Sequence, residues 1–88
     1  MIRVLYYAGI REKAGTNETR LENFSGTVAD LVKHLEEHHG ISLQVEDVDL
    51  LSVLIFMVNG RHIAHVGGLD ASVSEGDVVS IFPLIGGG

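Results

Sequence analysis

The residues best placed to do chemistry are the three glycines that close the sequence, Gly86, Gly87 and Gly88, after the apolar stretch 82–85. Glycine has no Cβ, so such a run fits a narrow channel in which any side chain would clash. The reactive group is the α-carboxylate of Gly88, which is ionised at neutral pH because its ordinary pKa is about 3.5. Ordering a free tail costs about 1–2 kcal/mol per residue, so this composition favours a tail that a partner orders during a reaction. The alternative is a frayed end or a remnant of cloning.

The five histidines raise the possibility of a metal site. His34 and His38 are four residues apart on a predicted helix, a spacing that can chelate zinc, and His39 follows them. His62 and His65 flank a short predicted strand. No third ligand is placed convincingly beside either pair, and a metal site needs three or four converging ligands. We therefore interpret the histidines as structural and expect no metal; a metal-dependent enzyme is a distant alternative.

Composition and charge limit the classes of function. The 88 residues are 45% apolar and 20% charged, as in one folded domain, and they include no cysteine. The formal net charge of −6 argues against nucleic acid and anionic membranes as partners and favours a partner with a basic docking surface. The longest mostly apolar run is far shorter than the ~20 residues that span a bilayer, and no signal peptide is evident. We expect a cytoplasmic protein that is monomeric when free.

The clearest helix is predicted over TVADLVKHLEEHH, residues 27–39. Thr27 is a good N-cap, Asp30 imitates a capping box, and Gly40 is a natural stop. The helical spacing i, i+3, i+4, i+7 indicates one buried stripe, formed by Val28, Leu31, Val32 and Leu35.

Alternating and β-branched residues predict the strands. The first runs over residues 2–7 and pairs in a hairpin with a second, roughly 18–22, through a turn in REKAGTNE. Asn59-Gly60 suits a type I′ turn inside a second hairpin, and a turn at 75–77 leads to the last strand, 78–82. Residues 41–51 are expected to form a connection with at most a short strand or turn.

These elements predict a two-layer α+β domain, with one main helix packed on a mixed sheet of four to five strands. The first and last strands could pair in parallel at its centre, although the residues alone leave that pairing open. We expect a single domain over residues 1–82 and a flexible tail over residues 83–88.

The periodicity also indicates a docking face. The helix should cover the side of the sheet that carries Ile2, Val4, Tyr6, Val79 and Ile81. Apolar side chains would remain on the unshielded side, next to the tail, and an exposed apolar cluster is typical of an interaction site. These side chains are Leu5, Tyr7, Val78 and Phe82. The alternative is that residues 41–53 fold over this face as ordinary core.

Motifs along nearly the whole chain resemble the small subunit of molybdopterin synthase. VLYYAGIREKAG resembles its opening strand and turn, TVADLVKHL its helix, and VNG its hairpin. EGDVVSIFP is similar to its last turn and strand, and PLIGGG to its Pro-x-x-x-Gly-Gly ending. The wider group is formed by ubiquitin-like β-grasp proteins: sulfur carriers for molybdopterin and thiamine, and small archaeal modifier proteins. Thiamine-type carriers are usually shorter and lack this opening, whereas the molybdopterin and modifier types both fit.

The resemblance implies a ubiquitin-like β-grasp fold and names contact residues. It places partner contacts at Tyr7, His62 and Phe82, and Arg11 lies in the resembling opening as a further docking contact. The tail that an enzyme would bind comprises Pro83, Ile85, Gly86 and Gly87. The chain departs from the family at Leu84, where a second proline is common, and at Gly86, where a small residue with a Cβ is frequent.

The resemblance also implies a mechanism. A ubiquitin-activating-like enzyme would bind the tail with ATP and Mg²⁺ and adenylate Gly88, and a persulfide would then convert Gly88 to a thiocarboxylate. The sulfur would pass to the large subunit of molybdopterin synthase or to another acceptor. Alternatively, a lysine of a target protein, or Lys13 or Lys33 of a second copy, would form an isopeptide bond. In either case the chain is a carrier and not an enzyme, and it binds no cofactor itself. A β-grasp interaction module with an inert tail is the alternative.

Overall fold

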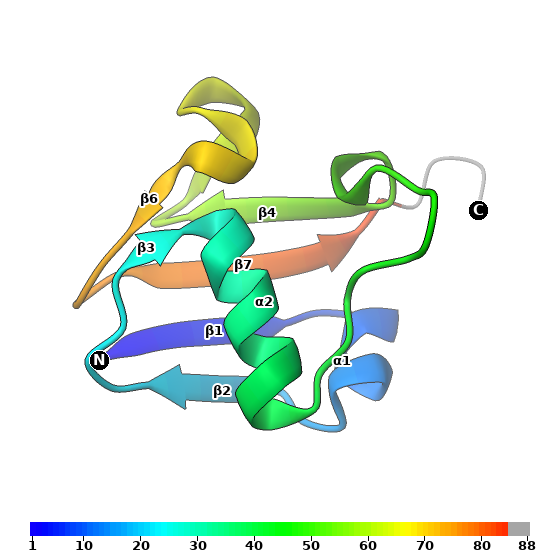
Figure 1. Ribbon diagram of the computed structural model, residues 1–88, viewed down its shortest axis with the longest axis horizontal. Coiled ribbons are helices and arrows are strands. Elements are labelled where there is room, and N and C mark those ends of the chain that lie inside the picture. Colours follow the sequence, from blue (N-terminus) through cyan, green and yellow to red (C-terminus); the bar gives the residue numbers. More distant parts are fainter. Residues whose placement is uncertain (85–88) are drawn as a thin grey trace.

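Helix α2 (Val28–His39) lies across one face of a five-stranded sheet (Figure 1). The structure, a computed structural model, describes residues 1–84. The sheet has the order β2-β1-β7-β4-β5, and its strands are β1 (Ile2–Tyr6), β2 (Glu18–Leu21), β4 (Leu54–Val58), β5 (Arg61–His62) and β7 (Val78–Pro83). The central pair, β1 and β7, is parallel, and the other neighbours are antiparallel. The α+β prediction is therefore confirmed, and the parallel pairing of the first and last strands, which the sequence left open, is present in the structure.

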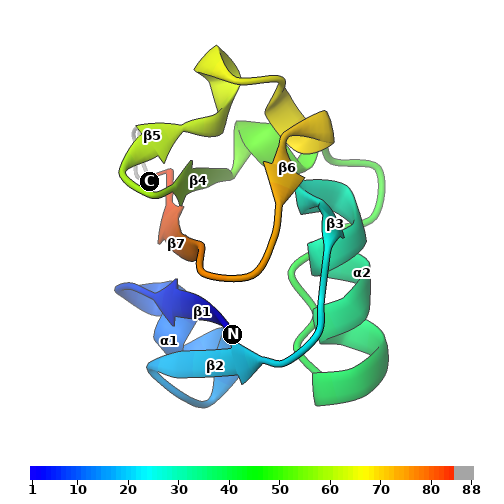
Figure 2. The same cartoon turned by 90° about the vertical axis from the view of Figure 1, so that its left-hand side faces the viewer.

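The buried face of the sheet follows from the alternation in each strand. Ile2, Val4 and Tyr6 of β1 point toward α2, as do Val79 and Ile81 of β7, and all five are at most 2% exposed. They meet the predicted stripe of α2, which is also buried. Figure 2 shows the sheet and α2 as two layers, with α2 on one side of the sheet.

Helix α2 begins and ends where the sequence predicts. The Thr27 hydroxyl accepts the Asp30 N–H, and the Asp30 carboxylate accepts the Thr27 N–H at 2.9 Å, which completes a capping box and lowers the pKa of Asp30. Gly40 closes the helix in the left-handed region, with φ 67°.

Replacing Thr27 with alanine is expected to lower the free energy of unfolding by about 1 kcal/mol, because the N–H of Asp30 loses its acceptor. For a domain of this size that corresponds to a fall in Tm of roughly 4–8 °C, measured by circular dichroism. Thr27→Ser keeps the hydroxyl and serves as the control. A serine variant as unstable as the alanine variant would contradict the capping role.

Several short elements differ from the sequence interpretation. The predicted turn after β1 contains a short helix, α1 (Gly9–Ala14), which buries Ile10 and ends at Gly15 with φ 75°. A separate two-stranded ladder joins β3 (Gly26–Thr27) to β6 (Ser72–Val73). Short 3-10 turns occupy Leu50–Ser52, Ile63–His65 and Gly68–Asp70. Strand β1 ends at Tyr6 and β2 at Leu21, each one residue earlier than expected, whereas β7 continues to Pro83.

Candidate functional site

The end of β7 fixes the position of Leu84, the last residue that the structure describes. Pro83 lies opposite Leu54 of β4, and the N–H of Leu84 donates to the carbonyl of Val53 at 2.9 Å. Ile85, Gly86, Gly87 and Gly88 lie outside the described residues, so the roles assigned to them remain predictions. The end of β7 therefore lies beside the start of β4, and Leu84 is next to Val53.

Tyr7 and Phe82 form an aromatic pair beside that point. Their rings stack with centroids 4.3 Å apart and planes 11° apart. Tyr7 is 38% exposed and Phe82 is half-buried, so the pair presents apolar surface on the face of the sheet opposite α2. This face, defined by the outward side chains of the five strands and Tyr7, is called the outer face below. The structure therefore brings two of the predicted docking residues into direct contact.

The strand register joins the remaining predicted docking residues to this pair, except Arg11. Leu5 lies opposite Ser80 of β7, Ser80 lies opposite Met57 of β4, and Met57 lies opposite His62 of β5. Leu5 and His62 are therefore the two ends of one row of side chains that runs across the outer face. The next row along the strands contains Tyr7 and Phe82. Both residues are half-buried.

Arg11 is exposed on α1, outside the strands that form the outer face. Its side chain forms no ion pair within residues 1–84. The structure therefore does not join Arg11 to the other predicted contacts, and its docking role stays a prediction.

Two outer-face residues that the sequence interpretation missed are Ile55 and Met57. Ile55 lies opposite Phe82 in the β4–β7 ladder. Together with Phe82 and Pro83, the two residues line a shallow apolar groove of about 390 Å³. The signal was present in LIFMV, where Ile55 and Met57 are alternate residues, but the face they occupy depends on the register with β7.

Residues 41–53 do not cover the outer face. They run along the helix side of the sheet (Figure 1), where Ile41, Leu43 and Leu50 join the same buried cluster as α2. The alternative that this segment folds over the docking face is therefore wrong.

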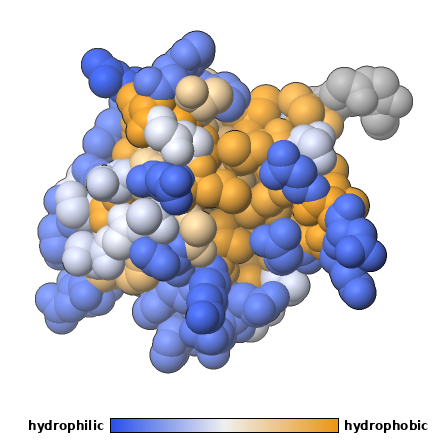
Figure 3. Space-filling view, turned by 45° about the horizontal axis from the view of Figure 1, so that its top comes forward, coloured by the Kyte–Doolittle hydropathy of each residue, from blue (hydrophilic) through white to orange (hydrophobic). Residues whose placement is uncertain are grey.

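Figure 3 shows apolar surface near the end of the described chain, on the side of β4 and of this segment. Exposed or partly buried apolar residues of this segment are Val45, Leu51 and Val53, and Leu84 at the end of the described chain is also exposed.

His62 has a local structural role in addition to its place on the outer face. Its Nδ1 accepts the N–H of Ala64 at 3.0 Å and caps the 3-10 turn that follows β5. In the neutral ring the proton is therefore on Nε2. Any test of His62 as a docking residue must separate the loss of the ring from the loss of this cap.

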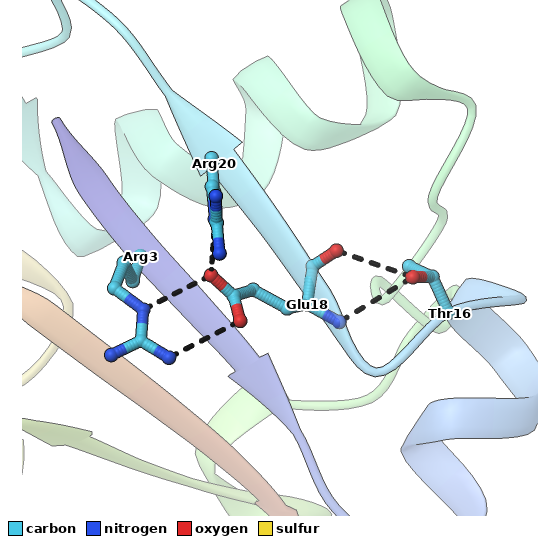
Figure 4. Close-up of polar contacts among 4 residues, drawn as sticks. All are labelled: Arg3, Thr16, Glu18 and Arg20. Carbon is cyan, nitrogen blue, oxygen red and sulfur yellow. Dashed lines mark hydrogen bonds and ion pairs between the residues drawn. The ribbon is translucent and has the colours of Figure 1, made fainter.

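At the other end of the outer face, a carboxylate holds two arginines (Figure 4). Glu18 accepts the Nε–H of Arg3 at 3.0 Å and an Nη2–H at 3.2 Å, and it accepts the Nε–H of Arg20 at 2.7 Å. The two hydrogen bonds from Arg3, then the one from Arg20, lower the pKa of Glu18 from 4.5 to about 2. Because Arg3 lies opposite Arg20 in the β1–β2 ladder, the strand register brings these charges together.

The lowered pKa of Glu18 predicts a pH dependence of stability. A carboxyl whose pKa is lower in the folded chain contributes stability above its unfolded value, and this contribution is lost as pH falls from about 4.5 to about 2. We expect the Tm of the unmodified protein to fall more steeply over this pH window than the Tm of the Glu18→Gln variant, because the amide of the variant does not titrate. Equal slopes in thermal melts of the two proteins would show that the interaction does not stabilise the fold.

The helix histidines form a cluster on α2 without a metal site. The rings of His34 and His38 have centroids 4.5 Å apart, and His34 lies 5.0 Å from Phe24. Burial, then the neighbouring His38 and His39, lowers the pKa of His34. Within residues 1–84, no group of three or more His, Asp or Glu side chains could hold a metal ion.

Neither helix of the described residues has the length and apolar content needed to cross a membrane.

Comparisons with known proteins place this geometry in a family. The ThiS family profile matches residues 4–88. The chain is 33% identical to the molybdopterin synthase sulfur carrier subunit of Escherichia coli over 100% of both chains. It is 30% identical to small archaeal modifier protein 3 of Haloferax volcanii over 99% of this chain and 98% of that protein.

Solved structures support the same assignment. The crystal structure of SAMP1 from Haloferax volcanii has a TM-score of 0.77 over 99% of this chain and 98% of that one, and at 23% identity it shows the fold. The crystal structure of the Amycolatopsis orientalis BexX/CysO complex contains a chain with a TM-score of 0.76 and 26% identity, over 94% of each chain. The predicted resemblance and the ubiquitin-like β-grasp fold are confirmed. The chain therefore belongs to the ThiS family, among ubiquitin-like β-grasp relatives that include a sulfur carrier subunit and a small archaeal modifier.

Proposed function

We propose that this chain is a sulfur carrier or protein modifier that acts through the carboxylate of Gly88. The observation that carries the proposal is the match over the full length of both chains to a molybdopterin synthase sulfur carrier subunit, in a chain whose sequence closes on three glycines. The similarity to a small archaeal modifier supports the second mode of use. Both modes need the same activated atom, the carbonyl carbon of Gly88.

The first step is activation by a ubiquitin-activating-like enzyme that holds ATP and Mg²⁺. A carboxylate oxygen of Gly88 attacks the α-phosphate of ATP and pyrophosphate leaves, which produces a Gly88 acyl-adenylate. The adenylate makes AMP a good leaving group, so a nucleophile can attack the carbonyl carbon. The ATP and Mg²⁺ belong to the enzyme, and this chain supplies the substrate atom and the docking surface; we place the reaction in the cytoplasm.

In the sulfur route, the terminal sulfur of a persulfide on a partner displaces AMP and forms an acyl disulfide. A second thiol then attacks the sulfur that belongs to the partner's cysteine, which breaks the S–S bond and leaves a thiocarboxylate on Gly88 and a disulfide on the partners. Both thiols must come from partners because the chain contains no cysteine. Delivery to the large subunit of molybdopterin synthase is one use of this thiocarboxylate.

In the modifier route, the amine of a lysine on a target protein attacks the activated carbonyl carbon. AMP or an enzyme thiol leaves, a proton is lost from the nitrogen, and an isopeptide bond forms. Activation is common to both routes, so the route is decided by which nucleophile reaches Gly88.

Activation is tested by pyrophosphate release. The cognate activating enzyme, incubated with ATP and Mg²⁺, is expected to release pyrophosphate only when the carrier is added. A chain without Gly87 and Gly88 should dock but release none. Equal release with both proteins would overturn the assignment of Gly88 and leave the chain as a docking module with an inert tail.

A further inference from the structure

The charge of the outer face is opposite to the charge of the whole chain. The net charge is −6, yet the outward strand positions of the five-stranded sheet carry two arginines and one glutamate, a net +1 with histidine neutral. Removing this +1 from the total leaves −7 on the rest of the chain. The charged members are Arg3, Glu18 and Arg20, and the other outward members are Leu5, Ile55, Met57, His62, Val78, Ser80 and Phe82.

The two arginines are held in place and still have hydrogen-bond donors to spare. A guanidinium has five N–H groups. Glu18 takes two from Arg3 and one from Arg20, as Figure 4 shows, and the remaining side-chain donors of both residues bond to nothing else within residues 1–84. The side chains of Arg3 and Arg20 are 46% and 63% exposed, so these donors face the side from which a partner would approach.

This charged cluster is close enough to the aromatic pair to share one partner. Arg3 and Tyr7 are four residues apart on one side of β1 and its extension, which is about 13 Å along a strand. A protein interface of standard size covers about 800 Å² of each partner, the area of a disc about 16 Å in radius. Leu5, opposite Glu18, lies between the two ends of the face and makes it continuous.

We propose that the protein that docks on the Tyr7–Phe82 end of the outer face places an Asp or Glu carboxylate against Arg3 and Arg20. Planar guanidinium groups bind carboxylates in bidentate geometry, and Glu18 acts as a positioning residue that holds them on the face. The net charge of the chain favours a basic partner surface, whereas the local charge of this face favours an acidic one next to an apolar strip. The inference rests on the proposed function, because the partner that adenylates Gly88 must cover this end of the molecule.

The test compares two charge reversals that alter the net charge equally. Arg20→Glu changes the outer face, and Arg61→Glu changes an exposed arginine of β5 that lies opposite Val58, on the other side of the sheet. The dissociation constant for the cognate activating enzyme and the KM for the carrier are measured at about 0.05 M and about 0.3 M salt. Arg20→Gln is included because it adds no second carboxylate beside Glu18, and thermal melts verify that each variant is folded.

We expect Arg20→Glu to raise the dissociation constant and KM roughly five- to tenfold at low salt, with kcat unchanged and a smaller effect at high salt. Arg20→Gln should give about a threefold rise, and Arg61→Glu should stay within about twofold of the unmodified chain. Equal effects at positions 20 and 61, or tighter binding of Arg20→Glu, would overturn the inference.

The two proposals fail in different ways. If the unmodified chain binds the enzyme but no pyrophosphate is released, the proposed function is wrong and the dissociation constants still decide the charge inference. If the chain releases pyrophosphate with no dependence on salt or on Arg20, the function stands and the charge inference is wrong. If the unmodified chain does not bind the enzyme, both are overturned.

Discussion

Removing Gly87 and Gly88 is expected to abolish adenylation, thiocarboxylate formation and conjugation together, because all three need a carboxylate at the end of a tail without side chains. The shortened chain still ends in a carboxylate, that of Gly86, but this group falls two residues, about 7 Å, short of the position of Gly88, so the expected loss is complete. Pyrophosphate release, intact mass and conjugate formation measure the three outcomes with the same enzyme preparation.

A matched control separates the chemistry from the docking. Replacing Gly87 with alanine keeps the chain length and the terminal carboxylate but adds one Cβ. This variant should have a strongly reduced kcat, while its dissociation constant for the activating enzyme should stay within about twofold of the unmodified value. Full activity of the alanine variant would contradict a narrow channel for the tail. Full activity of the shortened chain would contradict the role of Gly88.

Truncating the aromatic pair is expected to have the second largest effect. Phe82 stacks on Tyr7 and lines the groove with Ile55, Met57 and Pro83, so we expect it to be an anchor for a partner at this end of the outer face. Truncation of such an anchor costs about 2 kcal/mol, which is roughly a 30-fold weaker dissociation constant. Phe82→Ala should therefore weaken binding to the activating enzyme by about this factor, as measured by titration calorimetry.

Two controls accompany this variant. Phe82→Tyr keeps an aromatic ring against Tyr7 and should restore most of the affinity. Val45→Ala removes an apolar side chain with 39% exposure from the connection on the helix side of the sheet, and it should change the affinity less than about twofold. Phe82→Ala with unchanged affinity, in a variant that is folded by thermal melting, would show that the partner does not use the outer face.

Much of the fold is predictable because its signals are local. The spacing of Leu31 and Leu35 fixes the buried side of α2, and Thr27 with Asp30 fixes its start. Asn59 and Gly60, both at positive φ, make the β4–β5 turn predictable from two residues. The parallel pairing of β1 with β7 and the short pair β3–β6 depend on contacts between distant residues, and no local pattern specifies them.

The elements that were missed are short or depend on register. Helix α1 has six residues, begins after Ala8 at φ 51° and ends at a glycine, so its sequence is typical of a turn. The outward placement of Ile55 and Met57 needs the pairing of Ile55 with Phe82, because a shift of one residue would turn both side chains inward.

The charge of the docking face illustrates the same limit. Arg3 and Arg20 are seventeen positions apart in the sequence, and they meet at Glu18 only through the register of β1 with β2. Net charge, a property of the whole chain, is −6, whereas the outward strand positions of this face carry a net +1. The reactive residues proposed at the tail rest on the sequence alone, because glycine content and a terminal carboxylate require no fold to be recognised.

The intact mass of the chain, measured after incubation with the cognate activating enzyme, ATP, Mg²⁺ and a persulfide sulfur donor, shows whether Gly88 is activated. We predict a mass gain equal to the exchange of one oxygen atom for sulfur, located at Gly88 and absent from the chain that lacks Gly87 and Gly88. If the tail is used only as a modifier, the same reaction supplied with target proteins gives isopeptide conjugates instead. An unchanged mass together with no conjugates would contradict the claim that Gly88 is activated.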